Sequence, residues 1–162
     1  MRLVPLLAAL ALAGSADAAL PRAGVLVPGR SLGGIELGAA AAEVKAIWGS
    51  RFGRCRSCSG TTWYFNLRPF QPQGAGVELL NGRVVAVFTL WSPPGWRTTR
   101  GLRLGDTSAR VTSLYRPVGR FTCSERLTAL TVASGTTITA FYVLDEQLWG
   151  FGLVRAGVSV CR

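Results

Sequence analysis

Residues 34–38 read GIELG, and residues 101–105 read GLRLG. In both places a valine follows six residues after the second glycine, at Val44 and at Val111. The two copies are therefore offset by 67 residues. A repeat of this length is typical of a duplicated supersecondary unit. The sequence thus predicts two copies of one small unit.

The first motif leads into a predicted helix of about ten residues, opened by the good helix formers Ala39–Ala42. Val44, Ile47 and Trp48 are spaced i, i+3, i+4, which predicts one apolar stripe along that helix. Gly49 fits its C-terminal end.

The second motif predicts a matching helix over about residues 107–115. Asp106 is its expected N-cap, because a carboxylate can accept from the free N–H groups of the first turn. Arg116-Pro117 ends the helix.

Strand patterns follow each helix. Asn81-Gly82 stands between two apolar runs and predicts a hairpin with a type I′ turn, and Asp145-Glu146 holds the corresponding place in the second copy. The predicted strands are residues 61–67, 77–80, 83–91, 127–133, 137–144 and 147–154. The expected fold class is α+β, with two tandem units that each pack a short helix on a three- to four-stranded antiparallel sheet.

The start of the chain has the pattern of an export signal. Arg2 precedes an apolar run, and Ala16-Asp17-Ala18 fits the cleavage rule, so we expect cleavage before Ala19. No cysteine lies near this point, so we expect a mature chain without a lipid or membrane anchor, either secreted or located in the periplasm or cell wall. The predicted segments are the signal peptide 1–18, an extended leader 19–33, unit 1 at 34–91, a linker 92–97 and unit 2 at 98–162.

The spacing of Gly38, Val44 and Gly49 resembles the small helix-plus-sheet unit of outer-membrane assembly lipoproteins in the Gram-negative barrel-assembly machine. Two such units in tandem, exported and joined by disulfides, resemble beta-lactamase inhibitory proteins. That resemblance implies a non-catalytic protein that binds an enzyme. Two features depart from these families: Arg116 replaces the final glycine in the second copy, and the lipidated cysteine of the lipoproteins has no counterpart.

The formal net charge is +10, and Lys45 is the only lysine among 18 basic residues. Such a charge favours an acidic partner. The arginines are mostly scattered singly, and no recognised nucleic-acid motif occurs, so we expect no nucleic-acid partner.

Four cysteines in an exported chain predict disulfides. The simplest pairing is Cys55–Cys58 with Cys123–Cys161, and the alternative joins the two units, for example through Cys58–Cys123. The CxxC pattern of Cys55 and Cys58 also suggests a redox role. However, it follows a predicted helix and precedes a predicted strand, whereas the CxxC of thioredoxin-like proteins lies at the N-terminus of a helix. We expect no metal site, because the sequence holds no histidine to complete a ligand set.

The absence of histidine also excludes Ser-His and Cys-His nucleophile pairs. No phosphate-binding loop is found, so we expect no catalytic residue, no cofactor and no enzyme activity.

Aromatic residues are abundant on or beside the predicted strands. An antiparallel sheet with helices on one face has a second face, and aromatics with arginine there have the composition of a protein-binding surface. The candidate surface consists of Trp63, Tyr64, Trp91, Trp96, Arg97, Tyr142 and Trp149. The sequence therefore favours a secreted, non-catalytic protein-binding module, in its sharpest form an exported enzyme inhibitor. A cell-envelope structural or assembly module is the alternative, and a CxxC redox protein is the third. The partner would be an extracellular protein or an envelope component.

Overall fold

The computed structural model describes residues 24–55, 60–65, 74–91, 94–116 and 119–162. Within these ranges the helices are α1 (Ala41–Trp48) and α2 (Ser108–Leu114). The strands are β1 (Val25–Val27), β2 (Ser31–Leu32), β3 (Ile35–Glu36), β4 (Gly53–Arg54), β5 (Thr61–Phe65), β6 (Gly74–Leu80), β7 (Arg83–Leu90), β8 (Arg97–Thr98), β9 (Gly119–Thr122), β10 (Leu127–Ser134), β11 (Thr137–Leu144) and β12 (Gln147–Arg155).

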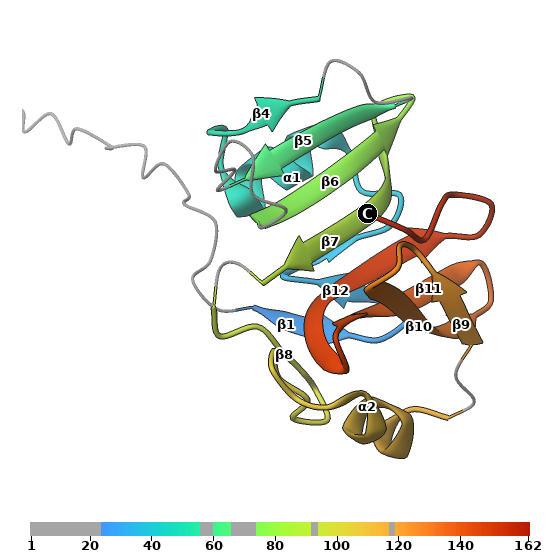
Figure 1. Ribbon diagram of the computed structural model, residues 1–162. Coiled ribbons are helices and arrows are strands. Elements are labelled where there is room, and N and C mark those ends of the chain that lie inside the picture. The colour runs from blue at the N-terminus through green and yellow to red at the C-terminus, as the bar shows by residue number, and fades with distance from the viewer. Residues whose placement is uncertain (1–23, 56–59, 66–73, 92–93, 117–118) are drawn as a thin grey trace, which may run out of the picture.

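The dominant element is one eight-stranded antiparallel sheet in the order β4-β5-β6-β7-β12-β11-β10-β9 (Figure 1). The α+β class with antiparallel strands is confirmed. However, the strands of the two predicted units do not form separate sheets, because β7 pairs with β12, with Leu90 opposite Gly150 and Phe88 opposite Gly152. The duplication and the unit boundaries stay predictions.

A second, smaller sheet has the order β3-β2-β1-β8, with β1 parallel to β8 and the other pairs antiparallel. Its strand β2 contacts β12 and its strand β3 contacts β7, so it lies across the junction of the large sheet. The part of the expected leader that the structure describes, from Gly24 onward, therefore belongs to the fold. The predicted signal peptide lies outside the described residues, as do residues 92–93 of the predicted linker.

The two copies of the glycine motif make the same backbone contact. Gly38 N–H donates to the Val84 carbonyl at 2.8 Å, and Gly105 N–H donates to the Leu148 carbonyl at 2.8 Å. Both glycines have positive φ, 85° and 86°, a conformation that strains other residues. Each motif is thus hydrogen-bonded to the second strand of the hairpin in its own half of the chain, β7 or β12.

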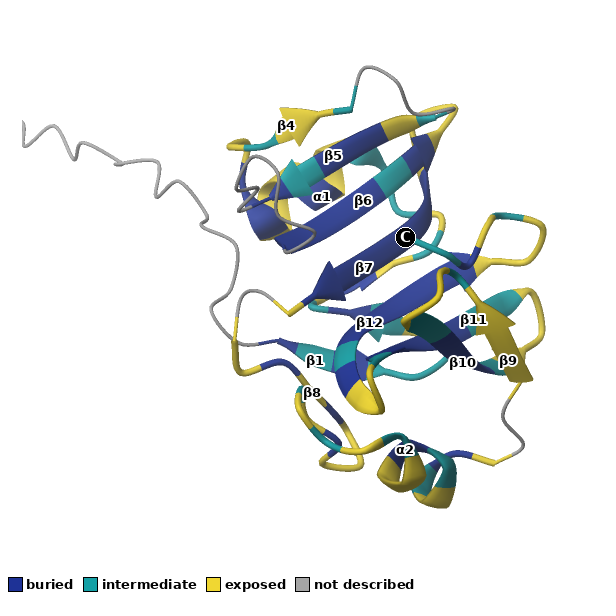
Figure 2. Ribbon diagram, in the orientation of Figure 1, coloured by how far each residue is buried: buried dark blue, intermediate teal, exposed yellow. Residues whose placement is uncertain are grey.

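The main hydrophobic core lies on the face of the large sheet that carries the helices (Figure 2). The two repeated valines, Val44 and Val111, are both 0% exposed in this core, and the aromatics that follow them, Trp48 and Tyr115, are buried as well. The core is one cluster that includes residues from both halves of the chain. The repeated positions therefore serve packing, as their spacing predicts.

Both hairpin turns are confirmed. Asn81 and Gly82 have φ of 51° and 72°, and Asp145 and Glu146 have φ of 47° and 64°. The second turn holds this conformation without glycine. Arg126 forms an ion pair and hydrogen bonds with Asp145, and these interactions lower the pKa of the Asp145 carboxyl group.

Two local predictions about the helices are wrong. Ile47 is 42% exposed, so the buried stripe of α1 consists of Val44 and Trp48 without Ile47. The N-cap of α2 is Thr107, whose side chain accepts from Arg110 N–H, and not Asp106. Gly49 ends α1 as expected, with φ of 89°.

In the described part of the chain, neither helix has the length and apolar character needed to cross a membrane.

The β7–β12 junction leaves no room for a side chain at Gly150. A Cβ at this position would clash with the backbone carbonyl oxygen of Thr89, which cannot move without breaking the strand pairing. Gly150→Ala should lower the free energy of unfolding by about 3 kcal/mol, measured by urea denaturation. The control is Gly135→Ala, at a hairpin turn with open space around it and φ of 57°, where we expect a loss of about 1 kcal/mol. An equal loss in both variants would contradict the tight junction.

Candidate functional site

The second face of the large sheet carries a smaller hydrophobic cluster, which includes Phe88, Leu90, Tyr142 and Val160. Val160 does not belong to the sheet. It lies in the C-terminal tail, which we define as residues 157–162. This face, predicted to be open, is thus partly covered by the chain itself, and the C-terminus lies on the side of the sheet opposite α1 (Figure 1).

Two interactions attach the C-terminal tail to the second half of the sheet. A disulfide joins Cys161 to Cys123, with their Cα atoms 5.2 Å apart. The buried hydroxyl of Tyr142 donates to the Val160 carbonyl at 2.8 Å. Burial raises the pKa of Tyr142, and the nearby guanidinium of Arg162 opposes this shift. The tail is therefore held in a defined position over the sheet.

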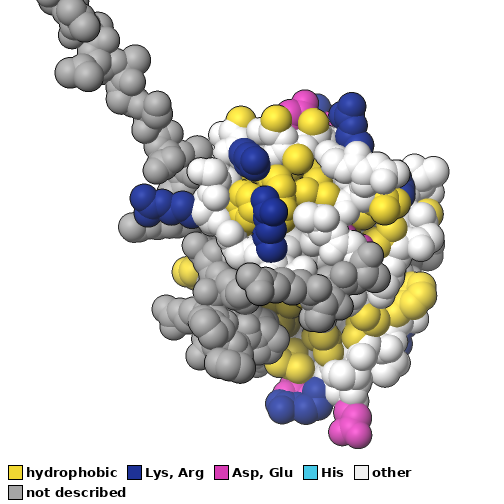
Figure 3. Space-filling view, turned by 90° about the horizontal axis from the view of Figure 1, so that it is seen from above, with side chains coloured by type: hydrophobic (Ala, Val, Ile, Leu, Met, Phe, Trp, Pro, Cys, Tyr) yellow, Lys and Arg dark blue, Asp and Glu magenta, His cyan; other side chains and the backbone are white. Residues whose placement is uncertain are grey.

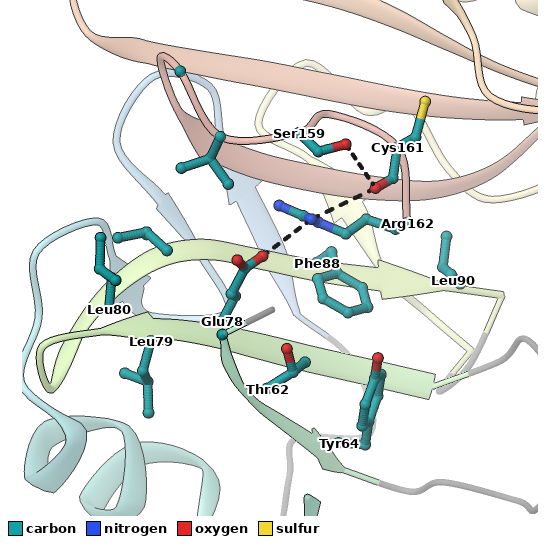
Figure 4. Close-up of a pocket in the computed structure, with 14 residues that line it drawn as sticks. Thr62, Tyr64, Glu78, Leu79, Leu80, Phe88, Leu90, Ser159, Cys161 and Arg162 are labelled. Atoms are coloured by element: carbon teal, nitrogen blue, oxygen red, sulfur yellow. Dashed lines mark hydrogen bonds and ion pairs between the residues drawn. The ribbon is translucent and has the colours of Figure 1, made fainter. Parts of the chain in front are cut away.

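Between the tail and the first half of the sheet lies a cavity of about 690 Å³. Tyr64, Phe88 and Leu90 line it from β5 and β7, and Leu80 lines it from the end of β6 (Figure 4). Val158 lines it from the tail. The walls are mostly apolar. A concave, largely apolar cavity with a few polar groups is the usual form of a ligand site.

One ion pair crosses this cavity. Nη1 of Arg162 lies 3.1 Å from Oε2 of Glu78, and the two side chains are only 9% and 20% exposed. The same guanidinium lies over the ring of Phe88, 5.5 Å from its centroid. Figure 4 shows Arg162 reaching from the tail to Glu78 on β6. The pair therefore connects the tail to the first half of the sheet.

The Arg162 guanidinium is not fully satisfied. Its Nε and Nη2 atoms are closed off from solvent and have no hydrogen-bond partner among the described residues. An unpaired buried donor is costly, so two such atoms on a residue that lines a cavity are candidate ligand contacts once the atoms that cover them move aside.

Three residues of the candidate surface predicted from the sequence are buried in the structure. Trp63 is buried in the main core, where it stacks on Phe52 at 4.0 Å, because the strand alternation turns it toward the helices. Trp96 is buried in the same core. Tyr142 does face the second side of the sheet, but the tail buries it.

Three other predicted residues do lie together on or beside the second face. Tyr64 and Trp149 pack against its cluster, and Trp91 stacks on Trp149 at 4.3 Å. Trp91 is 39% exposed and has a positive φ of 55°, which is rare for a large residue and often marks a functional position. Arg97 is exposed on β8, in the other sheet.

The residues that define the cavity, above all Glu78 and Arg162, do not stand out in the sequence. Phe88 and Leu90 are two residues apart on β7, so strand alternation places both on one face, the face that Tyr64 occupies on β5. Nothing in the local sequence links Arg162 to Glu78, since that contact requires the path of the tail after β12.

The pairing Cys123–Cys161 is confirmed, which excludes the alternative Cys58–Cys123. Cys55 also takes part in a disulfide, and Cys58 lies outside the described residues, so the predicted bond between them stays a prediction. None of the described cysteines is a free thiol. Within the described ranges, no three side chains of the Cys, Asp or Glu type are grouped as metal ligands.

A second aromatic and cationic area lies near β4. Lys45 is placed over Trp63 at 5.4 Å, and Arg54 over Phe52 at 5.8 Å. Figure 3, which views the molecule from above, shows basic side chains on hydrophobic atoms at this end. Trp63 is itself part of the main core, so the contact from Lys45 covers packed aromatic surface.

The sequence matches no known family model, and it matches no curated protein. Among solved structures it is similar to the crystal structure of an extracellular protein containing an SCP domain from Bacillus anthracis str. Ames. The two share 12% identity with a TM-score of 0.51, over 74% of this chain and 44% of the other. The chain thus spans less than half the length of that protein, and at this identity the likeness shows the fold alone.

The disulfide at the tail should contribute strongly to stability. Replacing both Cys123 and Cys161 by serine should lower the free energy of unfolding by about 3–4 kcal/mol, because the bond closes a long loop and restricts the unfolded chain. Chemical denaturation of the two proteins measures this difference. The amide protons of residues 157–162 should also exchange faster in the variant. Unchanged stability together with unchanged exchange would contradict the anchoring role.

Proposed function

We propose that this chain is an exported, non-catalytic binding module whose ligand site is the cavity on the second face of the large sheet. The observation that carries this proposal is the mostly apolar cavity of about 690 Å³ with a single, nearly buried ion pair in its wall. Binding sites generally combine such apolar walls with a few polar groups that orient the ligand.

The chemistry of the cavity supports binding more than catalysis. Its carboxylate, Glu78, is paired with Arg162. The hydroxyl groups that line it belong to Thr62, Tyr64 and Ser159, and no imidazole exists in the chain to activate them. The lining residues that the structure describes offer ligand contacts, and none of them forms a nucleophile and base pair.

The aromatic pair Trp91–Trp149 supports a site that extends beyond the cavity. Trp149 and Leu90 belong to the same cluster, and Leu90 also lines the cavity. A tryptophan pair beside a concave site, with Trp91 exposed and Trp149 half-buried, has the composition of a binding hot spot. A partner could therefore insert a side chain into the cavity and rest on the two indole rings.

The proposed partner is an extracellular protein or an envelope component. The sequence pattern of a signal peptide and the disulfide both support export, and the structural neighbour is described as extracellular. The net charge of +10 favours an acidic partner. The sharpest form of the proposal is an exported enzyme inhibitor built from two tandem units, for which class A beta-lactamases are the first enzymes to assay.

Site-directed photo-crosslinking tests where the partner binds. A benzophenone amino acid at Leu80, which is 49% exposed at the cavity, should form an adduct with a partner from culture medium or from the cell-envelope fraction. The matched control is the same amino acid at Ile47, which is 42% exposed on α1 and does not line the cavity. Mass spectrometry identifies the adducts.

The adduct at Leu80 should disappear when excess unmodified protein competes for the partner, and Ile47 should give no such adduct. Equal adducts at both positions, or none at Leu80, would overturn the proposed site. A competed adduct found only in the envelope fraction would favour an envelope assembly module over a secreted inhibitor.

A further inference from the structure

We propose that the cavity recognises a carboxylate joined to an apolar body, and that Arg162 is the residue that binds the carboxylate. This inference rests on the proposed function and names the chemistry of the ligand. In a protein partner, the group would be an acidic side chain, or the end of a chain, beside an apolar residue.

The free atoms of Arg162 have the right arrangement for a carboxylate. Nη1 is taken by Glu78 and also donates to the Cys161 carbonyl at 3.5 Å. The Tyr142 hydroxyl lies near the same guanidinium, but Nε and Nη2 form no hydrogen bond of normal geometry among the described residues. These two nitrogens lie on the same edge of the planar guanidinium, and their N–H bonds are parallel. A carboxylate accepts such a pair with both oxygens, and this geometry distinguishes arginine from lysine.

The surroundings of Arg162 favour a ligand of this kind. The side chain is 9% exposed, so a charge-assisted hydrogen bond to it would be little weakened by water. Phe88 lies directly against the guanidinium, and Leu90 and Tyr64 continue the apolar wall away from it. A ligand with a carboxylate at one end and a hydrocarbon chain or ring at the other would match both features.

Glu78 has two opposing effects on such a ligand. Its contact with Nη1 holds the guanidinium in place, but its negative charge repels an incoming carboxylate. Replacing Glu78 by glutamine keeps a hydrogen-bond acceptor of similar shape and removes the repulsion. If the Glu78–Arg162 pair served stability alone, removing the charge of Glu78 would not increase the affinity for a carboxylate ligand.

Entry to the site requires a small movement. Because Nε and Nη2 are closed off from solvent, the ligand must displace atoms that cover them. The tail is fixed at Cys161 and through Val160, whereas Gly157 and Ser159 are exposed. We therefore place the opening at the segment 157–159.

Isothermal titration calorimetry of the full chain with octanoate and with octanamide tests the inference, since the two probes differ only in charge and head group. Octanoate should bind with one site per chain and at least 10-fold more tightly than octanamide. A peptide pair, acetyl-Leu-Phe-Glu-amide against acetyl-Leu-Phe-Gln-amide, distinguishes a protein source of the carboxylate from a small acid. Tighter binding of the glutamate peptide than of octanoate would favour a protein segment.

Three variants complete the test, and each is checked for an unchanged circular dichroism spectrum at the temperature of the titration. Arg162→Met should abolish the preference for octanoate, Arg162→Lys should reduce it several-fold, and Glu78→Gln should increase octanoate affinity several-fold. Equal binding of octanoate and octanamide, or a preference that persists in Arg162→Met, would overturn the carboxylate site while leaving an apolar binding site intact. Failure of every probe to bind would overturn the proposed function as well. If Arg162→Met does not fold, Glu78→Gln tests the carboxylate site in its place. A several-fold gain in octanoate affinity supports the site, and an unchanged affinity overturns it.

Discussion

The pairing of β7 with β12 is the constraint on which the rest of the structure depends. It joins four strands from the first half of the chain to four from the second, so that one antiparallel sheet replaces two small ones. Close backbone approach at Gly150 permits this pairing. The joined sheet gives both helices a common core, so the two halves of the chain bury their apolar surface together.

The same junction creates the second face. Because β12 lies next to β7, the tail that follows β12 reaches across to β6, where Arg162 meets Glu78. The tail is fixed on its own half by the disulfide at Cys161 and leaves a cavity over the other half. The cavity thus follows from the order of the strands, and its polar groups come from both halves of the chain.

Much of the fold could be predicted from local sequence. Asn81-Gly82 located the first hairpin, and its counterpart Asp145-Glu146 was found by its position, although both of its residues adopt positive φ without glycine. The repeated valines marked the buried faces of the helices. These features succeed because turn geometry and helix periodicity depend on residues close together in the chain.

The site was predicted less well, for reasons that are physical. Alternation along β5 separates Trp63 from Tyr64, but the sequence does not say which face the helices cover. Tyr142 points to the second face and is nonetheless buried, because the tail lies over it. The contact between Arg162 and Glu78 depends on the whole path of the chain, so no local pattern could reveal it.

The proposed ligand of the second face carries a carboxylate, bound by Arg162, on an apolar body. Nitrogen-15 NMR of the arginine side chains measures this contact directly, because each Nε–H gives its own signal. Adding octanoate should shift the Arg162 Nε–H proton signal downfield and slow its exchange with water, as a new charge-assisted hydrogen bond forms. An unchanged Arg162 signal at saturating octanoate, with shifts only at exposed arginines, would contradict the account.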